Sequence, residues 1–283
     1  MRTRSPYEAF QRGLRSGRSL LWSGLVVFAG CAVSPQQHAE TLAGVAGLRH
    51  RALSAGIFRL TAYVRISDPS QPLHVYIEGD GRAWLTRTEP SRDPTPRHML
   101  GLQLAVADRW PNVAYLARPC QFTREDPSCD VRYWTTRRYA PEVVTSLSDA
   151  ISVLEGPAPR QPVDLIGYSG GGALAVLVAA RRHDVRSLRT IAANLDVEGV
   201  NALHHVSTMP ESLNPIEFVA AVRAVPQIHF YGSRDSIVPP DIARRFAEAI
   251  GGSCTTIQSI DGMTHDGDWG RLWPQLLQQT PHC

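Results

Sequence analysis

The sequence contains no lysine, so all 29 of its basic residues are arginines. It also has no internal repeat and no long stretch of low complexity, which speaks against a repeat architecture. Charged residues make up 19% of the chain, which is too few for a disordered protein. With 43% hydrophobic residues, the 283 positions are enough to bury one large core.

The apolar run near the N-terminus, residues 20–28, is too short to span a bilayer as a mature helix. Five arginines precede this run and small residues follow it, which is the arrangement of an export signal. We therefore expect residues 1–30 to form a signal peptide, and residues 31–56 to form a linker to the folded domain.

The stretch "FAGC", residues 28–31, resembles the lipobox of bacterial lipoproteins, in which the cysteine is lipidated and becomes the new N-terminus. This resemblance implies that Cys31 anchors the exported chain by a lipid to the bacterial cell envelope, on the periplasmic or outer-membrane side. Phe28 stands where a leucine is usual. Simple secretion, with cleavage nearby, is therefore the alternative.

An excess of positive charge is also absent once the signal is removed. The whole chain carries a net charge of +3, from 29 basic and 26 acidic residues, and residues 1–30 hold five arginines but only Glu8 as an acid. The remaining chain has 24 basic and 25 acidic residues, a net charge of −1. A nucleic-acid partner therefore has no electrostatic support.

Cysteine is scarce, and no two cysteines form a Cys-x-x-Cys pair, so neither a redox role nor a zinc site is indicated. Apart from Cys31, the chain has four cysteines, an even number that indicates two disulfides in an exported protein. Of the three pairings, we expect Cys120 with Cys129 and Cys254 with Cys283. Free buried thiols are the alternative.

After the linker, residues 57–283 alternate apolar strands with helices and read as one domain. The pattern predicts strands at 58–66, 73–77, 113–117, 163–166, 188–192, 228–231 and 255–260, and helices at 97–107, 141–154, 170–182, 241–250 and 270–278. This order predicts an α/β fold with a mostly parallel, doubly wound sheet and helices on both faces. Functional groups should then cluster at the carboxyl ends of the strands.

The segment "VDLIGYSGGG", residues 163–172, places Ser169 between an apolar strand and an alanine-rich helix. A serine on such a turn is presented on a sharp elbow that points its hydroxyl into a cleft. Gly167 and Gly171 allow strand and helix to approach closely. The N–H of Gly170 lies at a helix N-terminus, where it can stabilise a developing oxyanion. A glycine-rich loop without chemistry is the alternative interpretation of these letters.

Two further residues follow predicted strands and complete a catalytic pattern. Asp235 lies in "YGSRDSIVPP" after the strand at 228–231, and His265 lies in "DGMTHDGDW" after the last strand. The chain order Ser169, Asp235, His265 is the order of the α/β-hydrolase triad. Asp196, in "AANLDVEG", also follows a strand and is the alternative acid.

On "GYSGG", "YGSRDSIVP" and "GMTHDGDW", the chain resembles the α/β-hydrolase superfamily over residues 57–280, and particularly its bacterial esterase-like members with a lipoprotein signal. The stretch "VYIEGDGRAW", residues 75–84, looks like the oxyanion loop of that superfamily, with Glu78 where a histidine is usual. The resemblance implies that the N–H of Asp80, with Gly81 as a substitute, joins Gly170 in receiving the oxyanion.

The resemblance also implies a serine hydrolase that cleaves carboxylic esters through an acyl-enzyme, with Ser169 as nucleophile, His265 as base and Asp235 orienting the histidine. The expected partner is a small-molecule acyl substrate, and no metal or cofactor is required. A peptidase or an acyltransferase on the same scaffold is the nearest alternative. A non-catalytic envelope-binding protein is the alternative from another class.

Overall fold

The computed structural model describes residues 33–156 and 161–283. The expected signal peptide and Cys31 lie outside the described residues. In the part of the chain that is described, no helix is long and apolar enough to cross a membrane.

An eight-stranded sheet forms the centre of the domain, in the order β1-β2-β4-β3-β5-β6-β7-β8. Strand β2 pairs antiparallel with β1 and with β4, whereas all pairs from β4 to β8 are parallel. The mostly parallel sheet expected from the sequence is therefore confirmed. The strands are β1 (Arg49–Ala55), β2 (Phe58–Ile66), β3 (Leu73–Ile77), β4 (Asn112–Leu116), β5 (Val163–Tyr168), β6 (Val185–Ile191), β7 (Gln227–Gly232) and β8 (Thr255–Ile260).

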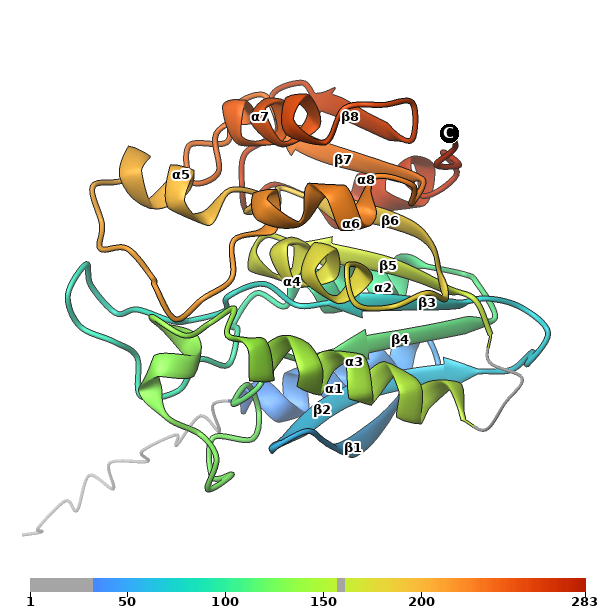
Figure 1. The fold of residues 1–283 in the computed structure, drawn as a ribbon. Coiled ribbons are helices and arrows are strands. Elements are labelled where there is room, and N and C mark those ends of the chain that lie inside the picture. Colours follow the sequence, from blue (N-terminus) through green and yellow to red (C-terminus); the bar gives the residue numbers. More distant parts are fainter. Residues whose placement is uncertain (1–32, 157–160) are drawn as a thin grey trace, which may run out of the picture. The chain divides into compact units, whose positions relative to one another are not determined.

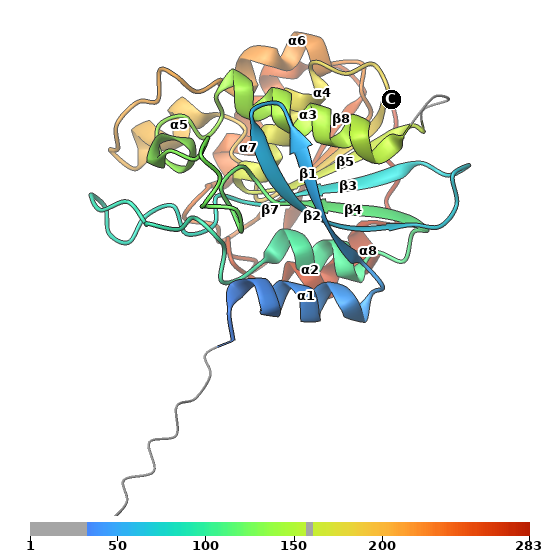
Figure 2. The same cartoon turned by 90° about the horizontal axis from the view of Figure 1, so that it is seen from below.

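Helices cover both faces of the sheet, so two apolar cores form, one on each side (Figures 1 and 2). One face carries α1 (Pro35–Val45), α2 (Leu100–Ala107) and α8 (Trp269–Leu276). The other carries α3 (Pro141–Glu155), α4 (Gly170–Ala179), α5 (Val197–Leu203), α6 (Val219–Val222) and α7 (Pro240–Ile250). The nearly all-apolar α4 packs fully buried on β5, which is why its sequence has no polar face.

The prediction of a linker at residues 31–56 is wrong, because α1 and β1 occupy most of this segment. A capping box starts α1: the Ser34 hydroxyl accepts from the Gln37 N–H, and the Gln37 side chain accepts from the Ser34 N–H. Strand β1 lies at the sheet edge, and its first four residues are exposed. Its charged residues therefore hide the apolar alternation by which a strand is recognised.

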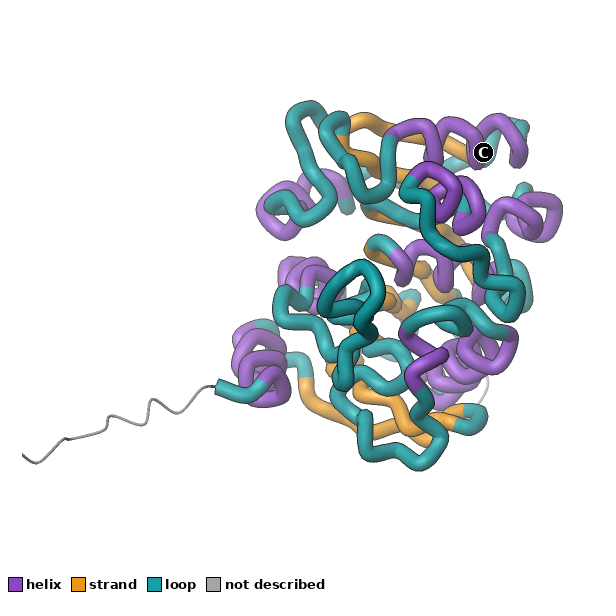
Figure 3. Tube along the Cα trace, turned by 90° about the vertical axis from the view of Figure 1, so that its left-hand side faces the viewer, coloured by secondary structure: helices purple, strands orange, loops and turns teal. Residues whose placement is uncertain are grey.

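Long loops follow the carboxyl ends of the strands, on the left of Figure 1 and facing the viewer in Figure 3. The loop between β4 and α3 contains a short 3-10 helix, Val131–Trp134, and is closed by a disulfide between Cys120 and Cys129. A second disulfide joins Cys254, just before β8, to Cys283. Both pairings are those expected from the sequence.

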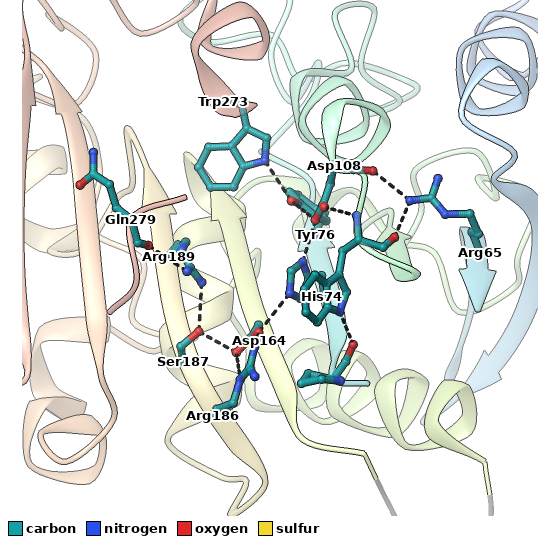
Figure 4. Close-up of polar contacts among 12 residues, drawn as sticks. Arg65, His74, Tyr76, Asp108, Asp164, Arg186, Ser187, Arg189, Trp273 and Gln279 are labelled. Carbon is teal, nitrogen blue, oxygen red and sulfur yellow. Dashed lines mark hydrogen bonds and ion pairs between the residues drawn. The ribbon is translucent and has the colours of Figure 1, made fainter. Parts of the chain in front are cut away.

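A buried polar network lies at the amino ends of β3, β5 and β6 (Figure 4). His74 Nδ1 lies 2.7 Å from an oxygen of Asp108, and its Nε2 lies 3.1 Å from an oxygen of Asp164. Burial lowers the pKa of His74, but hydrogen bonds and charge attraction from both aspartates outweigh it, so the pKa is raised. The network thus places a buried imidazole between two carboxylates.

Candidate active site

Ser169 lies on the turn between β5 and α4, with a φ angle of 52°. A non-glycine residue in this left-handed region carries backbone strain, which is common where a side chain must be presented to a ligand. The turn is tight enough that a Cβ on Gly167 would overlap the carbonyl oxygen of Gly171, and a Cβ on Gly171 would overlap that of Ile77. The glycines flanking Ser169 are therefore required by close approach of the backbone.

Three side chains from separate loops form a chain of hydrogen bonds. His265 Nε2 lies 3.0 Å from Ser169 Oγ, and His265 Nδ1 lies 2.8 Å from Asp235 Oδ2. The other carboxylate oxygen of Asp235 accepts from the N–H groups of Ile237 and Val238 at 2.9 and 2.8 Å. Asp235 is thus held on both oxygens, which fixes the orientation of the imidazole.

Two aromatic residues, not anticipated from the sequence, hold the loop that carries His265. The indole N–H of Trp269 donates to the His265 carbonyl at 3.1 Å, and the Tyr168 hydroxyl donates to Asp266 at 3.0 Å. Trp269 is fully buried and Tyr168 is 8% exposed. The backbone around the imidazole is therefore anchored to α8 and to the strand that leads into Ser169.

The alternative acid, Asp196, lies elsewhere and is excluded from this chain of hydrogen bonds. Its carboxylate accepts from the Gly199 N–H at 3.0 Å as the cap of α5, and it forms an ion pair with Arg245 at 2.9 Å. Asp196 follows β6, whereas Asp235 follows β7, the strand that pairs with β8. Of these two acids, Asp235 is therefore the one that lies next to the loop carrying His265 and bonds to its imidazole.

An open cleft of about 770 Å³ reaches Ser169 and His265. The loop after β3 forms one wall and the loop after β8 forms the other. Its lining residues are Glu78, Gly79, Asp80, Gly81, Arg82, Trp84, Pro96, Arg97, His98, Leu100, Gln103, Tyr168, Ser169, Ile237, His265, Asp266, Gly267 and Asp268. The cleft thus brings the predicted oxyanion loop to the hydroxyl of Ser169.

At the start of the loop after β3, from Glu78 to Arg82, two backbone N–H groups have no protein acceptor among the described residues. Glu78, Gly79 and Arg82 each donate their N–H to a protein oxygen, whereas the N–H groups of Asp80 and Gly81 have no protein acceptor in residues 33–156 and 161–283. The N–H of Gly170, in the first turn of α4, likewise has none there. These are the donors that the sequence indicates for an oxyanion.

The side chain of Asp80 is bound by two arginines. One carboxylate oxygen pairs with Arg118 and the other with Arg138, at 2.5 Å in the second case. Burial raises the pKa of Asp80, but the charges of Arg138 and Arg118 outweigh it and hold the pKa well below its usual range. Asp80 is therefore an ionised, immobilised carboxylate rather than a proton donor.

Glu78 stands where the resemblance leads one to expect a histidine, and the structure gives it another role. Its carboxylate accepts from the N–H groups of Gly79, Gly101 and Leu102 at 2.9, 3.1 and 3.3 Å. Burial raises the pKa of Glu78 despite these hydrogen bonds. The side chain thus ties the oxyanion loop to the N-terminal turn of α2.

Metal chemistry was not expected here. Within the described residues, no group of three or more histidine, cysteine, aspartate or glutamate side chains is arranged to hold a metal ion.

Solved structures with similar folds include serine hydrolases, esterases and peptidases. Est1E from Butyrivibrio proteoclasticus has a TM-score of 0.58 and 16% identity, covering 81% of this chain and 96% of that one. An α/β serine hydrolase homologue from Coxiella burnetii has a TM-score of 0.54 and 16% identity, covering 80% and 92%. A puromycin-hydrolysing peptidase from Mycobacterium tuberculosis has a TM-score of 0.58 and 16% identity, covering 81% of this chain and 38% of that one. The expected α/β-hydrolase fold is confirmed.

Sequence comparison identifies the family. No curated protein sequence matches the chain. The profile described as serine hydrolase (FSH1) matches residues 111–266, a span that includes Ser169, Asp235 and His265. Because this match covers more than half of the 283 residues, the chain belongs to the FSH1 serine hydrolase family.

Proposed function

We propose that the protein hydrolyses carboxylic esters by transferring the acyl group first to Ser169 and then to water. The observation that carries the proposal is the continuous hydrogen-bond chain from Asp235 through His265 to Ser169, which opens into the cleft. In such a chain, a serine hydroxyl, otherwise a weak nucleophile, is activated by the adjacent imidazole.

In the first half of the reaction, Ser169 Oγ forms a bond to the ester carbonyl carbon while His265 Nε2 takes the hydroxyl proton. The carbonyl electron pair moves to oxygen, and the N–H groups of Gly170 and Asp80 donate to this oxyanion. When the tetrahedral intermediate collapses, the bond to the alkoxide breaks and His265 returns the proton to the leaving oxygen. The acyl group is then held on Ser169.

In the second half, water repeats the same steps. His265 takes a proton from water, the oxygen adds to the acyl carbon, and Ser169 leaves and recovers the proton. Asp235 holds His265 with Nδ1 protonated, so that Nε2 faces Ser169 as the base in both halves. The carboxylate also stabilises the imidazolium that forms transiently.

Labelling with a fluorophosphonate probe tests this proposal, with the hydrolysis of p-nitrophenyl esters measured alongside. We expect the probe to modify Ser169 in the folded protein and to fail with Ser169→Ala. Ser70→Ala is the matched control, because Ser70 lies in an exposed turn before β3, at the other end of the sheet. A folded wild-type protein that stays unlabelled and hydrolyses no ester would overturn the proposal.

The same scaffold carries other acyl transfers, and three substrates separate them. Matched ester and amide substrates distinguish an esterase from a peptidase, and an added alcohol acceptor detects acyl transfer. We expect ester hydrolysis to dominate. The non-catalytic alternative is disfavoured because the cleft is open to Ser169 rather than occluded.

We also propose that the chain is exported and anchored to the cell envelope by lipid on Cys31. The support is the sequence alone: five arginines, a short apolar run and "FAGC". The two disulfides are consistent with an oxidising compartment.

A further inference from the structure

The peptide group between Gly79 and Asp80 is held from behind by a side chain outside the cleft lining. The Gln121 side-chain N–H donates to the carbonyl oxygen of Gly79 at 2.9 Å. Gln121 is 1% exposed and comes from the loop after β4, 42 residues further along the chain. Its side-chain oxygen accepts from the backbone N–H of Arg118 at 3.0 Å, so both the oxygen and the nitrogen of the side-chain amide are hydrogen-bonded.

This contact fixes the direction of one N–H group. In a trans peptide the C=O and the following N–H point in opposite directions, because the six atoms of the unit lie in one plane. The Gly79 carbonyl points toward Gln121, so the N–H of Asp80 points away from it. Asp80 lines the cleft with Ser169, and its N–H has no protein acceptor among the described residues.

The loop that carries Gln121 is rigid in its own right. Cys120 and Phe122, on either side of Gln121, both have positive φ angles, 70° and 62°. The Phe122 N–H donates to Thr95 at 2.8 Å, and Cys120 is joined to Cys129. Non-glycine residues keep such angles only where the surroundings impose them. Two consecutive constraints around one buried glutamine indicate that its position matters.

We propose that Gln121 is a positioning residue for the oxyanion site: it orients the Gly79–Asp80 peptide so that the Asp80 N–H faces the acyl carbonyl. Gln121 acts through the backbone and does not contact the substrate. The inference rests on the proposed acyl transfer at Ser169. It predicts a selective effect on kcat, because the oxyanion forms only after Ser169 attacks.

The decisive variant is Gln121→Glu, which keeps an acceptor for the Arg118 N–H but presents an ionised oxygen to the Gly79 carbonyl. We expect kcat for p-nitrophenyl acetate to fall by about 10- to 100-fold, because a single oxyanion donor is worth a factor of about 100 or more. KM should change by less than about threefold. Glu125→Gln is the matched control, because Glu125 lies in the same loop but is exposed and pairs with Arg124.

Acidification should partly reverse the effect. The introduced carboxyl group, once protonated, regains an O–H that can donate to the Gly79 carbonyl, so the ratio of variant to wild-type kcat should rise as the pH is lowered from about 8 to about 5.5. Taking the ratio cancels the protonation of His265, which both proteins share. A role confined to stability would leave this ratio flat.

A second substitution covers failure of the first to fold. Gln121→Met keeps a side chain of similar length without any N–H donor, and it should lower kcat similarly but with no recovery at low pH. Wild-type kcat in folded Gln121→Met would reject the role of Gln121, because this side chain cannot donate to the Gly79 carbonyl at any pH. Failure of the wild-type protein to react with the fluorophosphonate would instead reject the proposed acyl transfer.

Discussion

The carboxylate of Asp80 lies directly against the backbone of Gly170, so closely that a Cβ at position 170 would overlap Asp80 Oδ1. The first residue after the nucleophile and the loop after β3 are thus in contact through an ionised side chain and a glycine. Each residue also contributes one of the N–H groups proposed to receive the oxyanion. Their spacing is set by this contact.

Gly170→Ala should therefore impair catalysis. The added methyl group forces Asp80 and its partner Arg118 aside, and displacement of a catalytic donor by about 1 Å costs about 100-fold in rate. We expect kcat for ester hydrolysis to fall by about 10- to 100-fold. Gly44→Ala is the control, because no atom lies within 4 Å of a Cβ there. Unchanged kcat in folded Gly170→Ala would contradict the assigned contact.

Asp235→Asn should lower kcat by on the order of 10³ to 10⁴ without unfolding the protein. The oxygen of the new amide can still accept from Ile237 and Val238, which leaves its NH₂ group facing His265 Nδ1. The imidazole then adopts the tautomer with a proton on Nε2 and cannot accept from Ser169. Steady-state kinetics measure the loss, and Asp196→Asn should leave the rate within about threefold.

Ionisation of the network around His74 should make stability depend on pH. Because the pKa of His74 is raised, this residue contributes to the free energy of unfolding in full below about pH 6.5. The contribution is lost as the pH rises through the raised pKa. The lowered pKa values of Asp108 and Asp164 give contributions that are full above about 4 and are lost as the pH falls. The network should therefore be strongest between about pH 4 and 6.5.

Urea unfolding of wild type and His74→Gln from about pH 4.5 to about pH 9 measures this window. The deficit of the variant in free energy of unfolding should be largest near pH 5 to 6 and should shrink toward pH 9. The other groups facing the network are Tyr76, Arg65, Arg186 and Arg189. His38→Gln, on an exposed face of α1, provides the control. A constant deficit at all pH values would show that folding does not raise the pKa of His74.

The two disulfides should differ in their effect on catalysis. Replacing Cys254 and Cys283 by alanine should cost roughly 3 to 4 kcal/mol of stability, because the bond closes a loop with a sequence separation of 29, and should leave kcat unchanged. Replacing Cys120 and Cys129 should cost roughly 2 to 3 kcal/mol, with a separation of 9. It should also lower kcat, because Gln121 loses its neighbouring constraint. Equal kcat in both double variants would argue against that link.

Lipidation of Cys31 is tested by mass spectrometry of the mature N-terminal peptide and by fractionation of cells. We expect the peptide to begin at a lipid-modified Cys31 and the protein to sediment with membranes. Cys31→Ser should be misprocessed or released. A soluble wild-type protein without lipid would indicate simple secretion instead.

The sequence proposes Ser169, Asp235 and His265 because each follows a strand within a short, recognisable segment. It does not decide between Asp235 and Asp196, since both follow strands; in the structure Asp235 follows β7, which pairs with β8, and it bonds to His265. Sheet order is a property of the folded chain that local patterns do not contain. The position of each acid relative to His265 therefore had to come from the structure.

Gln121 and Arg118 carry no such local signal. Both act on residues about 40 positions earlier, through a buried loop whose letters, "RPCQF", match no periodic pattern. The edge strand β1 is not predicted for another reason. Its exposed charged residues do not show the alternation typical of a strand, although its backbone is paired along its whole length with β2. Long-range contacts and edge strands are thus the features that local sequence patterns do not indicate.

The His74 network and the cleft lie at opposite ends of β3, and His74 is about 13 Å along the extended chain from Glu78, the first cleft residue after this strand. Substitutions that far apart, with no shared partner, have nearly additive effects. The pH range over which the fold is stable can therefore be changed through residues at the amino ends of the strands, without altering the groups that line the cleft.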